Sequence, residues 1–365
     1  MGSIAFTQRP GDAPLAQTTR IASLDQFRGY TVVGMLFVNF LNGFEAWPSI
    51  LKHHNTYCSY SDTIMPQFFF AVGFAFRLTY LRRMAVVGQA SAVASALRRS
   101  LGLILVGFVV YHLDGGVKSW GELQGLGFQG FFATAFKREL FQTLVHIAIT
   151  SVWVLPVISA RPTVRIFYLV GSAALHFCLS KWFYFDFAWN TPVIDGGQLG
   201  FLTWTVPLLV GTLAYDVVNE QGTGLRTLAI FAGFSGVLMA AGVAMAWIGG
   251  APVLVESNAP VTIWTMSQRT GSVSYLTFAS GVSLAVYAVF VIVTDRAGLN
   301  IGLFRTFGTN ALLAYLLHDM VASAVKPWMP KDAPGWYVAV GFGVYFGLNT
   351  LFIRNLEKNG LFLKL

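Results

Sequence analysis

The sequence predicts an all-α membrane protein, a bundle of about ten transmembrane helices with both termini in the cytoplasm. Three observations lead to this fold class. Hydrophobic residues make up 55% of the 365 residues and charged residues only 11%, a balance that no soluble domain of this length can cover with polar surface. The apolar runs are about 18 to 24 residues long, which matches helices that cross roughly 30 Å of hydrocarbon. They also lack the alternation at period two that a membrane barrel shows.

Ten apolar spans are expected in order along the chain, each long enough to cross a bilayer as a helix. They are residues 27–44, 62–81, 97–113, 141–158, 165–182, 199–218, 227–249, 272–294, 307–325 and 336–353. The longest connections, expected outside the cytoplasm, are residues 44–61, 114–139, 183–198 and 250–271. The chain is interpreted as one domain over residues 21–365, preceded by a disordered cytoplasmic lead over residues 1–20 that lacks the apolar core of a signal peptide.

The basic residues set the expected orientation. With the N-terminus inside, 16 of the 24 Lys and Arg residues fall on the cytoplasmic side, which is the usual topology signal of a multi-span protein. The same bias accounts for the net charge of +8, so the charge does not indicate a nucleic-acid partner. No Asn-x-Ser/Thr glycosylation sequence occurs, which favours a bacterial inner membrane over a eukaryotic luminal setting.

The first span carries polar groups at both ends. Asp25 and Arg28 are three positions apart, so on a helix they share one face and hold a guanidinium at the cytoplasmic mouth, where it can bind a phosphate. An ion pair that only marks topology explains the same two residues. Asn39 lies eleven residues deeper near the same face, and an interhelical hydrogen bond explains it nearly as well as a functional role.

The connection after the first span contains two adjacent histidines. Histidine is the side chain whose ordinary pKa suits a proton acceptor at neutral pH, and either His53 or His54 can hold that role. Asp62 is expected in the N-cap position of the second span. Capping alone would justify this carboxylate, but a carboxylate near the histidines can equally orient an imidazole and stabilise its charged form.

A second polar pair occurs late in the chain. Asn310 and His318 are eight positions apart, close to one face of the predicted span 307–325, and such intramembrane groups suggest a functional site. The remaining motifs resemble no nucleotide loop, zinc pattern or serine-hydrolase elbow, so no metal is expected. Cys58 and Cys178 are interpreted as inert thiols, with a disulfide as the alternative.

Taken in order, these motifs resemble the catalytic region of the heparan-alpha-glucosaminide N-acetyltransferase family and its bacterial relatives. The resemblance rests on Asp25-x-Phe27-Arg28-Gly29, Val38-Asn39, His53 and Asp62-x-x-x-Pro66, and on the later segment Asn310, Tyr315 and His318. The chain departs from that pattern in two places. Thr56-Tyr57-Cys58-Ser59 replaces a Trp-x-Gly element, and Val145-His146 stands where the family has Gln-Arg.

The resemblance implies a transmembrane acetyltransferase. It implies that acetyl-CoA enters from the cytoplasm and that the acetyl group reaches a sugar amine or hydroxyl on the other side, and it suggests a homodimer. It implies the key catalytic role for the loop histidine, His53 or His54, and a supporting role for Asn39, with Asp62 beside them. Arg28 is expected to bind CoA together with Asp25, Arg98 and Arg99. Asn310 and His318 are expected on the same, acetyl-CoA-binding side of the site. The hydrocarbon core is about 30 Å thick, so the histidine loop must dip into a passage between the helices.

A second hypothesis explains the same polar groups without CoA chemistry. Buried Asp, Asn and His side chains also occur in multi-span transporters and flippases, where they bind a small polar or glycan-related substrate or carry protons. The chain lacks the paired half-sequences typical of such proteins. A structural role for a bundle with incidental polar groups is the third interpretation.

Overall fold

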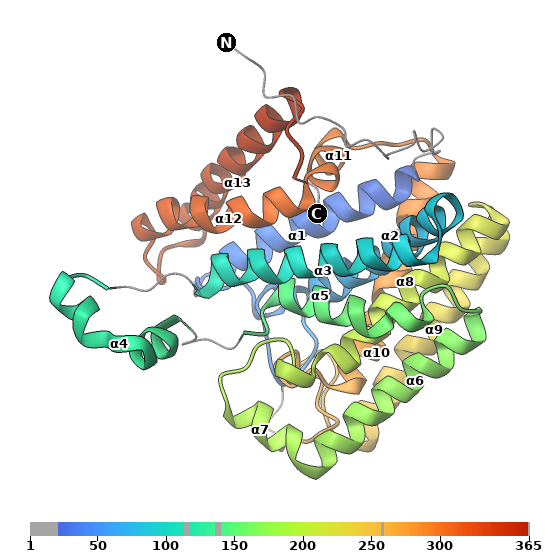
Figure 1. Cartoon of the computed structure of the whole chain (residues 1–365), viewed down its shortest axis with the longest axis horizontal. Helices are drawn as coiled ribbons and strands as arrows, with labels where there is room; N and C mark the ends of the chain where they lie inside the picture. Colours follow the sequence, from blue (N-terminus) through green and yellow to red (C-terminus); the bar gives the residue numbers. More distant parts are fainter. Residues whose placement is uncertain (1–20, 113–116, 136–139, 257–258, 364–365) are drawn as a thin grey trace.

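The computed structural model describes residues 21–112, 117–135, 140–256 and 259–363. Within these ranges the chain is helical and contains no strand, which confirms the predicted all-α class (Figure 1). The predicted disordered lead, residues 1–20, lies outside the described residues. The α-helices are α1 Ala22–Leu41, α2 Tyr60–Val87, α3 Gln89–His112, α4 Trp120–Ala135, α5 Thr143–Val154, α6 Pro162–Leu179, α7 Phe185–Asn190, α8 Phe201–Gln221, α9 Leu225–Ile248, α10 Val273–Phe290, α11 Gly302–Thr309, α12 Ala311–Val325 and α13 Gly335–Lys358.

Seven of the described helices are long and apolar enough to cross a membrane. They are α2, α3, α6 continued through α7, α8, α9, α10 with its π-helical extension to Arg296, and α13. Three predicted spans are not among them. In the predicted span 27–44, the helix α1 ends at Leu41 and carries several polar side chains. In the predicted span 141–158, the apolar helix extends only from Thr143 to Val157.

The third missing span is interrupted. Residues 307–325 are not one helix, because α11 ends and α12 begins at Asn310, whose backbone (φ −118°, ψ 32°) is not helical. Thr309, the last residue of α11, donates its hydroxyl to the carbonyls of Arg305 and Thr306. The prediction that Asn310 and His318 share one face of one helix is therefore wrong.

The centre of the bundle is the pair α2 and α8. α8 is buried along most of its length. Gly73 of α2 lies against the Leu208 carbonyl, and Gly211 of α8 lies against the Phe70 carbonyl, so neither position has room for a Cβ atom. Small residues at a helix interface let two backbones approach closely, which is the usual basis of packing inside a membrane.

A buried ionic cluster joins this pair to α6. Asp216 of α8 accepts hydrogen bonds from Arg77 of α2, at 2.7 and 3.1 Å, and from Arg165 of α6. Arg165 also donates to the Thr212 hydroxyl at 2.7 Å, and Arg77 to the Ile158 carbonyl. Because a buried charge is tolerated only when it is paired and hydrogen-bonded, this cluster fixes the relative positions of the three helices.

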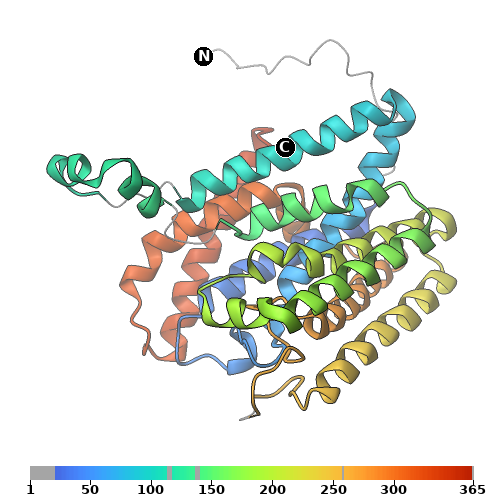
Figure 2. The ribbon, with the colours of Figure 1, turned by 60° about the horizontal axis from the view of Figure 1, so that its bottom comes forward.

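Two features stand out in the arrangement of the helices. α4 projects away from the bundle in both views, and α12 and α13 pack together on the side nearest α1 (Figures 1 and 2). α1 runs into the segment of residues 42–59, and α2 returns from it. We call residues 42–59 the histidine loop.

Candidate functional site

The histidine loop is held at both ends by specific hydrogen bonds. The Asn42 side chain accepts from the backbone N–H of His53 at 2.9 Å, and the backbone N–H of Cys58 donates to the Val253 carbonyl at 3.0 Å. Near its start the loop contains one short 3₁₀ turn, Ser49–Leu51. Both cysteines are free, and the Cys58 thiol is buried. The loop is therefore a fixed segment whose side chains have defined directions.

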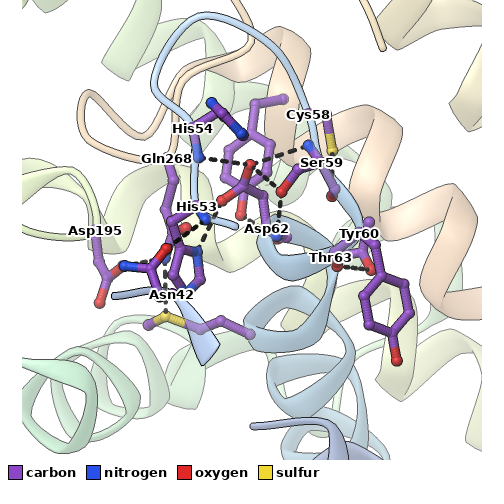
Figure 3. A network of polar contacts seen from close by, with 12 residues as sticks. Asn42, His53, His54, Cys58, Ser59, Tyr60, Asp62, Thr63, Asp195 and Gln268 are labelled. Atoms are coloured by element: carbon purple, nitrogen blue, oxygen red, sulfur yellow. Dashed lines mark hydrogen bonds and ion pairs between the residues drawn. The ribbon is translucent and has the colours of Figure 1, made fainter. Parts of the chain in front are cut away.

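Asp62 is the centre of the network that closes the loop (Figure 3). The expected N-cap position is wrong: Ser59 caps α2, and Asp62 is three residues further on in a reciprocal Ser-x-x-Asp capping box. The Asp62 carboxylate is completely buried. One oxygen accepts from the Ser59 hydroxyl at 2.8 Å and from the backbone N–H groups of Ser59 and His54 at 3.0 and 3.3 Å. The other oxygen accepts from His53.

His53 has the geometry of a general base. Its Nδ1 lies 2.9 Å from Asp62 Oδ1, and because a carboxylate only accepts, Nδ1 carries the proton and Nε2 keeps its lone pair. The side chain is 32% exposed, which leaves the ring open to reactants. Burial alone lowers the pKa of His53, but hydrogen bonding to Asp62 and the charges of Asp62 and Asp195 outweigh it, so the pKa is raised above 6.5.

His54 is directed elsewhere although it is the next residue. Its Nε2 donates to the Ser49 carbonyl at 2.7 Å, and its ring stacks on Tyr57 with centroids 4.3 Å apart. Of the two histidines, only His53 lines the large cavity described next. The structure therefore distinguishes two residues that the sequence left equivalent.

A cavity of about 1090 Å³ lies beneath the histidine loop. At one end its wall contains three arginines, Arg28 of α1, Arg83 of α2 and Arg99 of α3. At the other end it contains His53, Asp195 and a fourth arginine, Arg269. The wall between them is largely apolar, with side chains such as Phe68 and Phe76 of α2 and Leu312 of α12. One hollow thus connects three arginines near the start of α1 with a histidine and a carboxylate near its end.

Asn39 lies on the wall of this cavity, and His318 lies behind it. Asn39 Nδ2 is 3.4 Å from His318 Nε2. His318 Nδ1 faces the Tyr315 carbonyl, which only accepts, so Nδ1 carries a proton. His318 is buried and does not line the cavity, and its Nε2, the nitrogen that faces Asn39, also lies 3.2 Å from Asp319 Oδ1. His318 therefore contacts the site through Asn39 and Tyr315.

The other residues expected to bind acetyl-CoA separate into two groups. Arg28 and Arg99 line the cavity, whereas Arg98 is exposed and Asp25 is half-buried, and neither of these two is on the wall. Asn310 is buried beside Thr309, to whose hydroxyl oxygen its amide donates at 3.4 Å, and is also off the wall. Arg83, which the sequence analysis did not single out, takes the place expected for Arg98 and donates to the Ser95 hydroxyl.

Sequence reasoning also missed Asp195 and Gln268, which lie beside His53 (Figure 3). Gln268 Nε2 donates to Asp195 Oδ1 at 2.7 Å, and both residues line the cavity. They belong to two connections far apart in the sequence, before α8 and before α10. The signal available was weak: an acidic residue directly before Gly196-Gly197, in a connection with few charges.

Comparison with known proteins adds no assignment. No known family profile matches the chain, and no curated protein sequence is significantly similar to it. The described residues contain no group of three His, Cys, Asp or Glu side chains placed to hold a metal ion. The chemistry of the site therefore rests on its own geometry.

Proposed function

We propose that this protein is a membrane-spanning acyltransferase that moves an acetyl group from cytoplasmic acetyl-CoA to a sugar amine or hydroxyl on the other side of the membrane. The observation that carries the proposal is one cavity whose wall holds Arg28, Arg83 and Arg99 at one end and His53 at the other, with the His53 ring held by the buried Asp62. A cationic mouth suits the phosphates of CoA, and an oriented imidazole suits a nucleophile that must lose a proton. The ordered motifs that resemble the N-acetyltransferase family support the same activity.

The proposed topology places the arginine end of the cavity in the cytoplasm. It assigns about ten crossings to the chain, with α1, α5 and α11–α12 added to the seven long apolar helices. Both termini are then cytoplasmic, as the excess of Lys and Arg on that side predicts, and the proposed location is a bacterial inner membrane. α5 and α11–α12 are short or interrupted, and helices of that kind are tolerated where they line a polar cavity.

In the proposed reaction, His53 Nε2 takes a proton from the acceptor amine or hydroxyl. At the same time, the nitrogen or oxygen of the acceptor attacks the thioester carbonyl carbon. Asp62 holds the imidazole in the required tautomer and stabilises the imidazolium that forms. The carbon–sulfur bond then breaks, and the leaving CoA thiolate takes the proton from His53. The products are the acetylated acceptor and CoA, with no net change in protons on the enzyme.

Asn39 is the proposed donor to the thioester oxygen. Its amide nitrogen carries two hydrogens, and the single contact with His318 Nε2 uses at most one of them, so at least one is available to the cavity. A donor aimed at the oxygen on which negative charge develops typically contributes about 10²- to 10³-fold in rate. In this scheme His318 orients Asn39, and the arginines orient acetyl-CoA.

The test is acetyl transfer by the purified protein. Labelled acetyl-CoA is incubated with the protein, alone and with amino sugars or polysaccharide, and the release of CoA and the label on the acceptor are measured. Replacing His53 with Ala should lower the turnover about 10²- to 10⁴-fold, the typical contribution of a general base, and leave acetyl-CoA binding unchanged.

Two variants serve as controls. His54→Ala changes the adjacent imidazole, which does not line the cavity, and should keep most of the activity. Arg28→Ala should weaken acetyl-CoA binding itself. Full turnover in the His53 variant, or substrate transport without any CoA release, would contradict the proposed function and favour a transporter.

A further inference from the structure

Asp195 combines deep burial with an uncommon backbone conformation, and its carbonyl accepts from the indole N–H of the buried Trp204 at 2.6 Å. It lies in the connection between α7 and α8, and it is only 2% exposed. Within the described ranges it is the one residue other than glycine with a positive φ, at 56°. Aspartate and asparagine tolerate this left-handed conformation better than most residues, but such backbone conformations concentrate at functional sites.

The Asp195 carboxylate is also unusual in its surroundings. No Lys or Arg nitrogen of the described chain lies within 4.0 Å of it. Burial raises the pKa of Asp195 to about 6, while hydrogen bonds from Gln268 and Thr143 and the nearby His53 limit the rise. At neutral pH the group is therefore mostly ionised without a salt-bridge partner, an arrangement that is costly to keep.

One partner of the Asp195 carboxylate is Gln268. Since a carboxylate only accepts, the 2.7 Å contact assigns Nε2 to the end of the Gln268 amide that faces Asp195. The amide oxygen is then directed away from Asp195, and the Gln268 side chain lies beside His53 on the cavity wall (Figure 3). The two connections meet through Gly196 and Gly271, both of positive φ, where added Cβ atoms would collide with the facing glycine.

We propose that Asp195 is a positioning residue that acts through Gln268: it fixes the amide so that Gln268 Oε1 and His53 Nε2 together orient the acceptor. This inference rests on the proposed acetyltransfer function and adds the residues that bind the acceptor. The lone pairs of Gln268 Oε1 and His53 Nε2 fit a molecule with two neighbouring hydrogen-bond donors. An amine with two N–H groups and a polyol with adjacent hydroxyls are examples. His53 removes the proton from one donor, and Gln268 holds the other.

Every bond and proton in the transfer step is accounted for in this arrangement. The bond between the nucleophile and the carbonyl carbon forms, the carbon–sulfur bond breaks, and the proton passes through His53 to the CoA thiolate. Gln268 and Asp195 exchange no proton with the substrate. Their contribution is the orientation of the attacking lone pair, which typically matters more than any single contact energy.

The experiment compares side-chain replacements that keep the turn intact. Asp195→Gly removes the carboxylate but tolerates the positive φ, and Asp195→Asn tolerates it while keeping an oxygen that accepts from Gln268. Gln268→Leu removes the amide. Asp186→Asn removes a carboxylate from the exposed face of α7, off the cavity wall, and is the charge-matched control. The acceptor probes are methyl 2-amino-2-deoxyglucoside and methyl glucoside.

The proposal predicts an acceptor-specific defect. Asp195→Gly and Gln268→Leu should each lower kcat/KM for the better probe by about tenfold or more, with the acetyl-CoA dissociation constant unchanged. Asp195→Asn should stay within about threefold of wild type. The double variant should be no worse than Gln268→Leu alone, because the two residues act as one unit.

Other outcomes would overturn it. Asp195→Asn as defective as Asp195→Gly would mean that the charge, not the hydrogen bond, is needed. Additive losses in the double variant would mean that Asp195 does not act through Gln268. If the wild-type protein binds acetyl-CoA but acetylates neither probe, only the proposed sugar-acceptor subsite is refuted. If it binds no acetyl-CoA, the proposed function is refuted as well.

Discussion

At the scale of single residues, His53 and His54 show how a site depends on contacts that are distant in sequence. Both are loop histidines before a carboxylate, and nothing in their local pattern separates them. In the structure Asp62 fixes the His53 ring at the cavity, whereas a backbone carbonyl and Tyr57 hold the His54 ring away from it. The prediction of a histidine base near Asp62 followed from residue chemistry, but the choice between the two required the loop's path.

The raised pKa of His53 leads to a prediction about pH. A general base must be neutral, so activity should rise with pH on an acid limb centred above pH 6.5, the ordinary value for histidine. Replacing Asp62 with Asn removes the negative charge that favours the imidazolium, so the pKa of His53 should fall and the limb should move to lower pH. The maximal rate should fall too, because a neutral carboxamide fixes the tautomer less well than a carboxylate does.

The measurement is kcat/KM for acetyl transfer between about pH 5 and 9, a range that brackets the ordinary histidine pKa. Asp186→Asn removes the same charge from an exposed position, so its profile should match that of wild type. An acid limb that stays in place in Asp62→Asn would show that another group controls the activity.

At the scale of helices, length and apolarity were predictable, and interruptions were not. The seven long apolar helices correspond to spans expected from the sequence. The break at Asn310 arises where Thr309 turns its hydroxyl back to the chain and Gly308 lies directly against the Asp25 carbonyl of α1. That second contact joins segments far apart in the sequence, and a hydropathy pattern contains no information about it.

The glycines of α2 and α8 give a prediction about packing. A Cβ at Gly211 would overlap the Phe70 carbonyl, so Gly211→Ala must push apart the two central helices. We expect a loss of about 1–3 kcal/mol in stability, the usual cost of overpacking, seen as a lower thermal midpoint in detergent. Because α2 also carries Arg83 and Phe76 on the cavity wall, acetyl-CoA binding should weaken as well.

Gly233 supplies the matched control for this substitution. It lies in α9, and a Cβ there would meet nothing within 4 Å. Gly233→Ala should therefore leave the midpoint unchanged or raise it slightly, because alanine favours a helix more than glycine does. Equal midpoints for the two variants would contradict close packing of α2 against α8.

At the scale of the whole molecule, the sequence predicted a passage between the helices but not all of its wall. Arg28, Asn39 and His53 were singled out from residue type and position, Arg99 was expected from the family resemblance, and all four line this cavity. Asp195 and Gln268 were missed because they belong to separate connections that meet only when α8 and α10 pack together. A site assembled from distant loops leaves a faint local signal, here only the glycines next to each loop.

The central claim is that donor and acceptor reach the site from opposite sides of the membrane, and transfer in sealed proteoliposomes tests it most directly. Labelled acetyl-CoA is enclosed in the vesicles or added outside, and a membrane-impermeant sugar acceptor is placed on the same or the opposite side. The account predicts acetylated acceptor only when the two are on opposite sides, and loss of that product in His53→Ala. Transfer that occurs only when both are on the same side would contradict it.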